Sequence, residues 1–295
     1  MSRIAIVGVG AIGAVAAAGL LASGRNEVQL CVRRRFERLT VRAGSASFER
    51  AVTTFDSPDK VGARADFVLL ATKAHQTAGA APWLSALAGP RTVIAVLQNG
   101  VEHVERVTPY AGAARVLPVV VQCPAQSVEP GVIVQSAPCT LVAPDTADGG
   151  AFAALFKGSN VKVELEADFV TAAWDKLCRN VVSGAVTAIT MRPNNVVRDP
   201  GVAAFARGLV RECILVGRAE GAVLPDEVAE RVIAAMASSA DGRGNSMYYD
   251  RCAGRTLEVE ARNGAVVRFG ARHGIATPLN SAATAILTAI NSALA

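Results

Sequence analysis

The first 24 residues constrain the fold most strongly, because they combine an apolar run with three glycines at fixed spacing. Residues 3–24 read RIAIVGVGAIGAVAAAGLLASG. The apolar run before Gly8 predicts a buried strand, and the alanine-rich run predicts a helix that ends at Gly24. A GxGxxG motif between a strand and a helix is typical of dinucleotide-binding turns, in which the backbone approaches a pyrophosphate at the helix N-terminus. The expected cofactor-binding residues are Gly8, Gly10, Ala11, Ile12 and Gly13; the alternative is a purely structural turn.

The same segment has no charged residue from Ile4 to Gly24, so it also resembles an export signal or a short membrane span. The glycines argue against that alternative, because a targeting core usually continues as helix where this segment breaks. The uncharged C-terminal run, residues 274–295, carries Pro, Asn, Ser and Thr at helical spacing. This pattern favours a packing helix over a membrane anchor, and we expect no membrane partner.

Short apolar runs alternate with helical segments along the first half of the chain. The runs are EVQLCV, ADFVLLAT, RTVIAVLQNG and ARVLPVVVQC. This alternation predicts a parallel sheet, and the segments GVIVQSAPCTLVAP and VKVELEA are expected to be its closing strands. From Asp168 the pattern changes to long helices, beginning with DFVTAAWDKLCRNVVSGAVTAIT. The predicted fold class is therefore α/β, with an N-terminal Rossmann-type parallel-sheet domain over residues 1–166 and a second, mostly α-helical domain over residues 167–295.

The choice of dinucleotide depends on the residue that follows the second predicted strand. An NAD site usually has an acidic residue about 20 positions after the glycine motif, where it binds the ribose 2′-hydroxyl. Here that position is Arg33, the first of three consecutive arginines. A guanidinium suits a 2′-phosphate through bidentate hydrogen bonds, so Arg33 predicts NADP. The alternative is an ordinary solvated basic run.

Composition excludes several other classes of protein. The net charge is +5, and the basic residues are scattered apart from residues 33–35, so we expect no nucleic-acid partner. The six cysteines form no CxxC pair, which favours reduced thiols in the cytoplasm. The three histidines have no metal-ligand spacing, and we expect no metal site.

Several motifs, taken in their order along the chain, resemble the ketopantoate reductase (2-dehydropantoate 2-reductase) family. They are GVGAIG near the N-terminus, ATKAHQ with Lys73, QNG with Asn99, WDKLCRN with Lys176 and Asn180, TAITMRPNN with Asn194, and NSMYYDRCAGRTLEVEARNG with Ser246 and Glu258. The resemblance covers almost the whole chain. It implies a two-domain oxidoreductase that transfers hydride from NADPH to the carbonyl of a small 2-oxo acid.

The resemblance also implies a role for each matched residue. Lys176 and Glu258 are the expected catalytic residues, with Lys176 as the general acid. Asn180, Asn194 and Ser246 are expected to bind the substrate. Lys73, Asn99 and Glu258 are expected to bind the cofactor ribose or to orient the lysine. Lys176 and Asn180 are four residues apart and so share one helix face; the alternative for Lys176 is a solvated helix lysine.

The chain departs from the family pattern at one position of the same helix. Where the family has a second asparagine eight residues after the lysine, this sequence has Gly184. We expect the loss of that side chain to remove a hydrogen-bonding amide and to open space beside the reacting carbonyl. The alternatives are therefore a reductase or dehydrogenase for a bulkier 2-oxo or 2-hydroxy acid, and a non-catalytic NADP-binding regulator. A homodimer is a further expectation, and the physiological direction of the reaction stays open.

Overall fold

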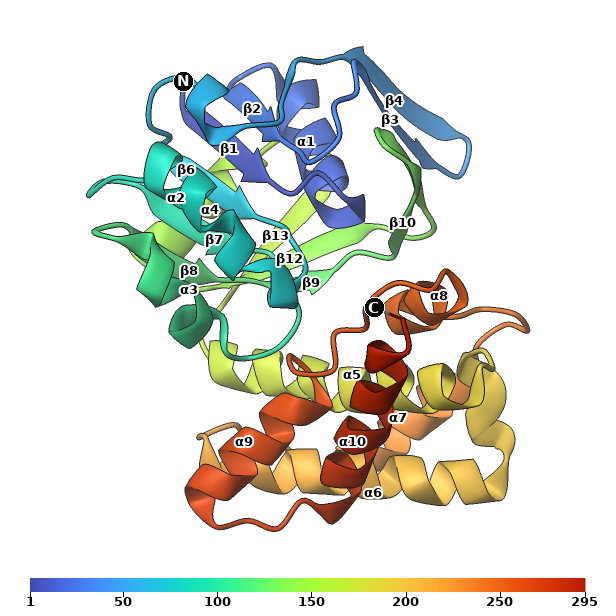
Figure 1. Ribbon diagram of the computed structural model, residues 1–295. Coiled ribbons are helices and arrows are strands. Elements are labelled where there is room, and N and C mark those ends of the chain that lie inside the picture. The colour runs from blue at the N-terminus through green and yellow to red at the C-terminus, as the bar shows by residue number, and fades with distance from the viewer. Residues whose placement is uncertain (295) are drawn as a thin grey trace. The chain divides into compact units, whose positions relative to one another are not determined.

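The computed structural model describes residues 1–294, which divide into two compact units, residues 1–169 and residues 170–294. Figure 1 shows sheet and helix in the N-terminal unit and helices in the C-terminal unit. Within residues 1–294, no helix is both long enough and apolar enough to cross a bilayer.

A parallel sheet of six strands forms the centre of the N-terminal unit. Its strand order is β5-β2-β1-β6-β7-β8, and every neighbouring pair is parallel. The strands are β1 (Arg3–Val7), β2 (Glu27–Cys31), β5 (Thr54–Phe55), β6 (Phe67–Leu70), β7 (Val93–Val96) and β8 (Arg115–Pro118). This is the strand order of the dinucleotide-binding fold, so the predicted fold class is confirmed. The segment that resembled an export signal forms β1 of this sheet and the turn and helix that follow it.

Alternate residues of the central strands pack on opposite faces of the sheet, as the pleat requires. Ile4, Ile6 and Leu69 face a core that includes residues of α1 and α4, whereas Ala5 and Ile94 face a core with residues of α2 and α3. The helices are α1 (Ala11–Ser23), α2 (Ala81–Leu87), α3 (His103–Ala111) and α4 (Ala147–Leu155). Because both faces are covered, these strands are uniformly apolar.

Two smaller sheets complete the N-terminal unit, and the sequence did not predict either of them. One has the order β10-β11-β3-β4, and the other has the order β13-β12-β9. Their strands are β3 (Arg38–Ala43), β4 (Ala46–Ala51), β9 (Val120–Gln122), β10 (Ala125–Glu129), β11 (Val132–Gln135), β12 (Cys139–Pro144) and β13 (Val161–Glu166). The expectation that segments 131–144 and 161–167 close the main sheet was wrong. The β3–β4 hairpin went unpredicted because β4 is exposed along almost its whole length and so has no apolar alternation.

The C-terminal unit is built from helices, as predicted. They are α5 (Phe169–Thr190), α6 (Pro200–Ala219), α7 (Val228–Ala237), α8 (Ser246–Cys252), α9 (Asn263–His273) and α10 (Pro278–Ser292). Trp174 of α5 packs edge-to-face on Phe269 of α9, with ring centroids 5.6 Å apart. A buried carboxylate, Glu212 of α6, accepts hydrogen bonds from the backbone N–H groups of Leu279 and Asn280 in the first turn of α10. An anion at a helix N-terminus is stabilising, so this contact fixes α10 on α6.

Candidate active site

Four predicted cofactor residues follow the carboxyl ends of neighbouring parallel strands. Gly8 follows β1, Arg33 follows β2, Lys73 follows β6 and Asn99 follows β7. Val7, the last residue of β1, is in register with Cys31 of β2 and Leu70 of β6, and Leu70 is in register with Val96 of β7. These four residues therefore lie along one edge of the sheet, the edge where ligands bind in folds of this type.

The glycine turn has the geometry of a phosphate-binding loop. Gly8 has φ +93°, and a Cβ on Gly13 would lie 2.2 Å from the Gly8 carbonyl oxygen, so these two glycines let the turn and helix pack closely. A Cβ on Gly10 would meet nothing within 4 Å. Gly10 precedes α1 without a side-chain cap, and the first turn of α1 has no acidic residue. The turn thus leaves open space at a helix N-terminus, which suits a pyrophosphate.

The residue that the sequence assigns to the 2′-phosphate lies two positions past the end of β2. Arg33 is exposed, and so are Arg34 and Arg35. The exposed guanidinium and the open glycine turn belong to adjacent strands, because the Gly8 N–H donates to the Cys31 carbonyl over 3.0 Å. The donor set at this edge therefore fits a dinucleotide that carries an additional phosphate.

The segment after β7 is held by buried polar contacts. Gln98 donates to the hydroxyl oxygens of Thr72 and Thr77 over 3.2 and 3.1 Å. The Nε2 of His103 lies 2.8 Å from the Gln98 carbonyl, and burial lowers the pKa of His103 to about 4. A neutral imidazole then donates to this carbonyl. His103 is therefore a structural residue, which positions the turn that carries Asn99.

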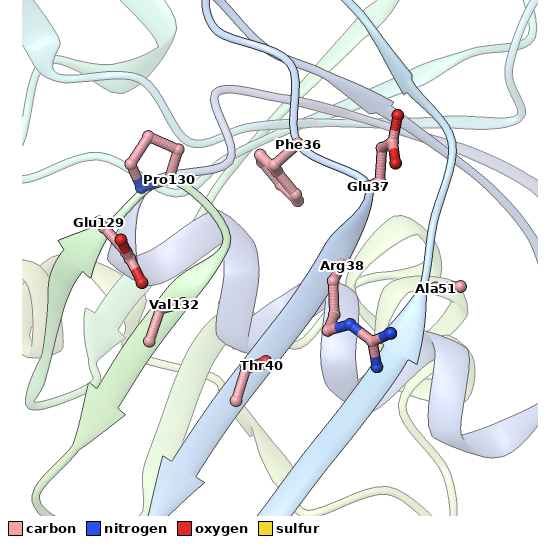
Figure 2. A pocket seen from close by; sticks show the side chains of 8 residues that line it. All are labelled: Phe36, Glu37, Arg38, Thr40, Ala51, Glu129, Pro130 and Val132. Atoms are coloured by element: carbon pink, nitrogen blue, oxygen red, sulfur yellow. The ribbon is translucent and has the colours of Figure 1, made fainter.

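The N-terminal unit also has a hollow of roughly 580 Å³ beside β3 and the β10–β11 turn, shown in Figure 2. Its lining residues are Phe36, Glu37, Arg38, Thr40, Ala51, Glu129, Pro130 and Val132. None of them is a predicted site residue, and Arg38 pairs with Glu49. The hollow has mixed polar and apolar walls without convergent polar groups, so we assign it no catalytic role.

In the C-terminal unit, one face of α5 carries Lys176, Asn180 and Gly184 at intervals of four residues. Asn180 and Gly184 are buried, and Lys176 is partly buried. Burial lowers the pKa of Lys176 to about 8, with further lowering from the charges of Arg179 and Arg262 and an opposite effect from Asp175. A lysine whose pKa is lowered toward neutrality is suited to proton transfer.

A buried ion pair lies close to this face of α5. Arg262 and Glu258 are each only 2% exposed, and the Arg262 Nη2 lies 3.6 Å from the Glu258 Oε2. The same nitrogen donates to the Ser246 hydroxyl oxygen over 2.8 Å. Two predicted site residues, Glu258 and Ser246, are therefore joined by an arginine that the sequence analysis missed. Its only signal in the sequence was an arginine directly before a helix.

The expectation that Gly184 opens space was wrong, whereas the loss of a side-chain amide at this position stands. A Cβ at this position would lie 2.6 Å from the Met247 sulfur and 3.0 Å from the Arg262 Nη1. The volume beside Gly184 is therefore occupied by Met247 and Arg262. The missing asparagine opens no additional space there.

Asn194 is held through a neighbour that the sequence analysis did not single out. Asn245 caps α8, since its side-chain oxygen accepts from the N–H groups of Met247 and Tyr248. Its amide nitrogen donates to the Asn194 side-chain oxygen over 2.9 Å and to the Ser183 carbonyl over 2.8 Å. Asn194 thus helps to hold the start of α8, where Ser246 is the first helical residue. An asparagine directly before a helix is the signal that could have identified Asn245.

Comparisons with known proteins cover both units. The family model described as "Ketopantoate reductase PanE/ApbA" matches residues 4–147, and its C-terminal counterpart matches residues 168–291. The chain is 42% identical over 289 residues to a 2-dehydropantoate 2-reductase of Caulobacter vibrioides, with 98% of this chain and 99% of the relative covered. It is 38% identical to a 2-dehydropantoate 2-reductase of Mycobacterium tuberculosis, with 97% of each chain covered.

A solved structure shares the same fold. A dimeric ketopantoate reductase from Staphylococcus aureus superposes with a TM-score of 0.90 at 26% identity, covering 99% of this chain and 100% of that one.

Replacing Lys176 by methionine tests the burial of the ammonium. The pKa of Lys176 is about 8 in the folded protein, against 10.5 for an ordinary lysine. Between pH 8 and pH 10.5 the unfolded chain binds more protons than the folded protein, so the contribution of Lys176 makes the free energy of unfolding rise with pH in this range. At pH 7 Lys176 is protonated in both states, and the full cost of burying its ammonium is present. We expect Lys176→Met to raise the thermal midpoint at pH 7 by roughly 2–4 °C and to raise it less at pH 10.

The control for this comparison is Lys157→Met at an exposed lysine, which should change the midpoint little at either pH. An equal effect of Lys176→Met at both pH values would show that the ammonium carries no burial cost.

Proposed function

The chain belongs to the ketopantoate reductase family, and from this premise we propose that it reduces the ketone of 2-dehydropantoate with NADPH. The observation that carries the proposal is the partly buried Lys176, whose pKa is lowered to about 8, on the same helix face as Asn180. The first test is the consumption of NADPH in the presence of 2-dehydropantoate and of a panel of other 2-oxo acids. Oxidation of NADPH that depends on none of these acids would contradict the proposal.

We assign the coenzyme to the carboxyl edge of the main sheet. The open position at Gly10 and the N–H groups of Ala11 and Ile12 would hold the pyrophosphate. Arg33 would pair with a 2′-phosphate, and Lys73 and Asn99 would contact the ribose. When bound, the reduced nicotinamide supplies the hydride. This assignment makes residues 1–166 the dinucleotide-binding domain and residues 167–295 the substrate and catalytic domain.

Lys176 would act as the general acid. Its ammonium would donate a hydrogen bond to the substrate ketone oxygen and then transfer a proton as negative charge develops on that oxygen. Because its pKa is lowered to about 8, the ammonium is more acidic than that of an ordinary lysine yet still mostly protonated at pH 7. The rate of reduction should therefore fall as the pH rises above about 8.

The substrate would be held by side chains around Lys176. The amide of Asn180 and the hydroxyl of Ser246 would bind the carboxylate and hydroxyl groups of a 2-oxo acid, and the Glu258 carboxylate would balance the charge of Arg262, with which it is paired. Asn194 would act through Asn245, to which it is hydrogen-bonded. The alternative of a bulkier acid loses its basis, because the volume beside Gly184 is filled. A regulator without turnover would have no need of an acidic lysine.

We also propose a cytoplasmic homodimer. The six cysteines all lie within the described residues and are free thiols, which suits a reducing compartment. The S. aureus relative is described as dimeric.

The variant Lys176→Ala separates chemistry from coenzyme binding. We expect kcat to fall by roughly 10²- to 10⁴-fold, the range for a lost general acid. The affinity for NADPH, measured by fluorescence titration, should stay close to that of the wild type, because the coenzyme residues lie in the N-terminal unit. Turnover at the wild-type rate would exclude Lys176 as the acid.

The variant Arg33→Asp tests the choice of coenzyme. It removes a partner of the 2′-phosphate and adds a like charge, so the KM for NADPH should rise much more than the KM for NADH. The matched control is Arg64→Asp, at an exposed arginine that precedes β6 and thus lies toward the opposite edge of the sheet. Equal changes for both coenzymes in Arg33→Asp would show that Arg33 does not contact the phosphate.

A further inference from the structure

Arg262 is the most deeply buried charge beside the candidate catalytic lysine. Its side chain is 2% exposed. Arg262 is the N-cap residue of α9, but its side chain makes no capping hydrogen bond to that helix. One nitrogen, Nη2, contacts both Ser246 and Glu258, and another, Nε, has no hydrogen-bond partner within residues 1–294. Burying a guanidinium is costly unless its partners compensate. The cost of burying Arg262 therefore points to a function for this side chain.

The Arg262 guanidinium lies beside the position of the missing amide. A Cβ on Gly184 would lie 2.6 Å from the Met247 sulfur and 3.0 Å from the Arg262 Nη1, so a larger residue at 184 would require both side chains to shift. The family pattern has an asparagine at 184, which offers one amide donor group on this face of α5. Here the donor at that place belongs to a guanidinium, which carries a positive charge and a fixed planar fork.

The contact with Arg262 determines what the Ser246 hydroxyl can do. Arg262 donates to the Ser246 oxygen over 2.8 Å, so one acceptor position of that oxygen is taken. The hydroxyl hydrogen stays available to be donated elsewhere, and Ser246 is an exposed residue. A donated hydrogen bond from a cation also polarises the O–H group, which strengthens its bond to an anion. The geometry therefore makes Ser246 a donor suited to a carboxylate.

The charges around Lys176 agree with this role. Arg262 and Arg179 act together with burial to lower the pKa of Lys176, and Asp175 opposes them. Asp175 is paired with Arg179 and Arg231, and Asp250 is paired with Arg255. The charges that act on Lys176 are thus two cations and one anion, and this positive surplus suits the carboxylate of a 2-oxo acid.

We propose that Arg262 is a positioning residue that takes the place of the missing amide at position 184 and holds the Ser246 hydroxyl as the hydrogen-bond donor to the substrate carboxylate. This inference rests on the proposed function, since it concerns the substrate of that same site. The substrate carboxylate would then be bound by the Ser246 hydroxyl, which the buried Arg262 holds in position.

The variant Arg262→Lys tests the proposal, because it keeps a positive charge beside Glu258 but removes the planar fork. We expect the KM for 2-dehydropantoate to rise roughly tenfold while the KM for NADPH stays within about twofold. The matched control is Arg268→Lys, on α9, where the arginine is 40% exposed and pairs with Glu260; it should leave both constants unchanged. A folded Arg262→Lys protein with the wild-type KM for 2-dehydropantoate would overturn the proposal.

A double-mutant cycle with Ser246→Ala distinguishes positioning from general structural support. If Arg262 acts through Ser246, the double variant Arg262→Lys, Ser246→Ala, which keeps the positive charge near Lys176, should lose no more kcat/KM than Ser246→Ala alone. Losses that multiply would show that Arg262 acts independently of the hydroxyl, and the proposal would then fail.

A measurement without coenzyme or substrate tests the close approach of position 184 to Arg262. Gly184→Asn should lower the thermal midpoint clearly in the wild-type background and less in an Arg262→Ala background, because the shorter residue vacates the space. Equal losses in both backgrounds would contradict the placement of Arg262. Failure of the proposed function would appear differently, as a wild type that does not oxidise NADPH with any 2-oxo acid while the coupling between positions 184 and 262 persists.

Discussion

A buried ion pair in the C-terminal unit constrains the side chains around it, because breaking the pair would strongly lower the stability of the fold. Arg262 and Glu258 are each 2% exposed, and removing either would leave an uncompensated charge in a low-dielectric environment. The buried guanidinium needs space and hydrogen-bond partners, and its charge acts on nearby groups, which explains features of several neighbouring residues. Ser246 accepts from it, Gly184 leaves room for it, and Lys176 has a lowered pKa partly because of its charge. One arginine thus relates the helix α5, the start of α8 and the segment before α9.

The N-terminal part of the parallel sheet could be predicted from sequence because its signals are local. An apolar strand, the glycines at 8, 10 and 13 and an alanine-rich helix lie within 24 residues, and the physical reason for each glycine involves atoms nearby in the chain. Gly13 approaches the Gly8 carbonyl, and Gly10 leaves open space. Parallel pairing then brings the residues after β1, β2, β6 and β7 to one edge, which follows from strand direction alone.

The parts that escaped prediction depend on contacts between distant segments. The contacts of Arg262 are with α5, α8 and Glu258, and no periodic pattern in the sequence predicts that these segments lie together. The effect of Gly184 was misjudged for the same reason, because the side chains that fill its volume come from positions 247 and 262. The β4 strand of the β3–β4 hairpin is exposed, so it lacks the apolar alternation from which strands are recognised.

The central claim is that this chain transfers a hydride to the ketone carbon of a 2-oxo acid while Lys176 supplies the proton. The most direct measurement uses NADPH with deuterium at C4 of the nicotinamide, prepared separately in its two stereochemical forms, and follows the label by mass spectrometry and proton NMR. With 2-dehydropantoate as substrate, we predict deuterium at C2 of the product from one form of the coenzyme and none from the other. Oxidation of both forms with no deuterium in the hydroxy acid would contradict the claim.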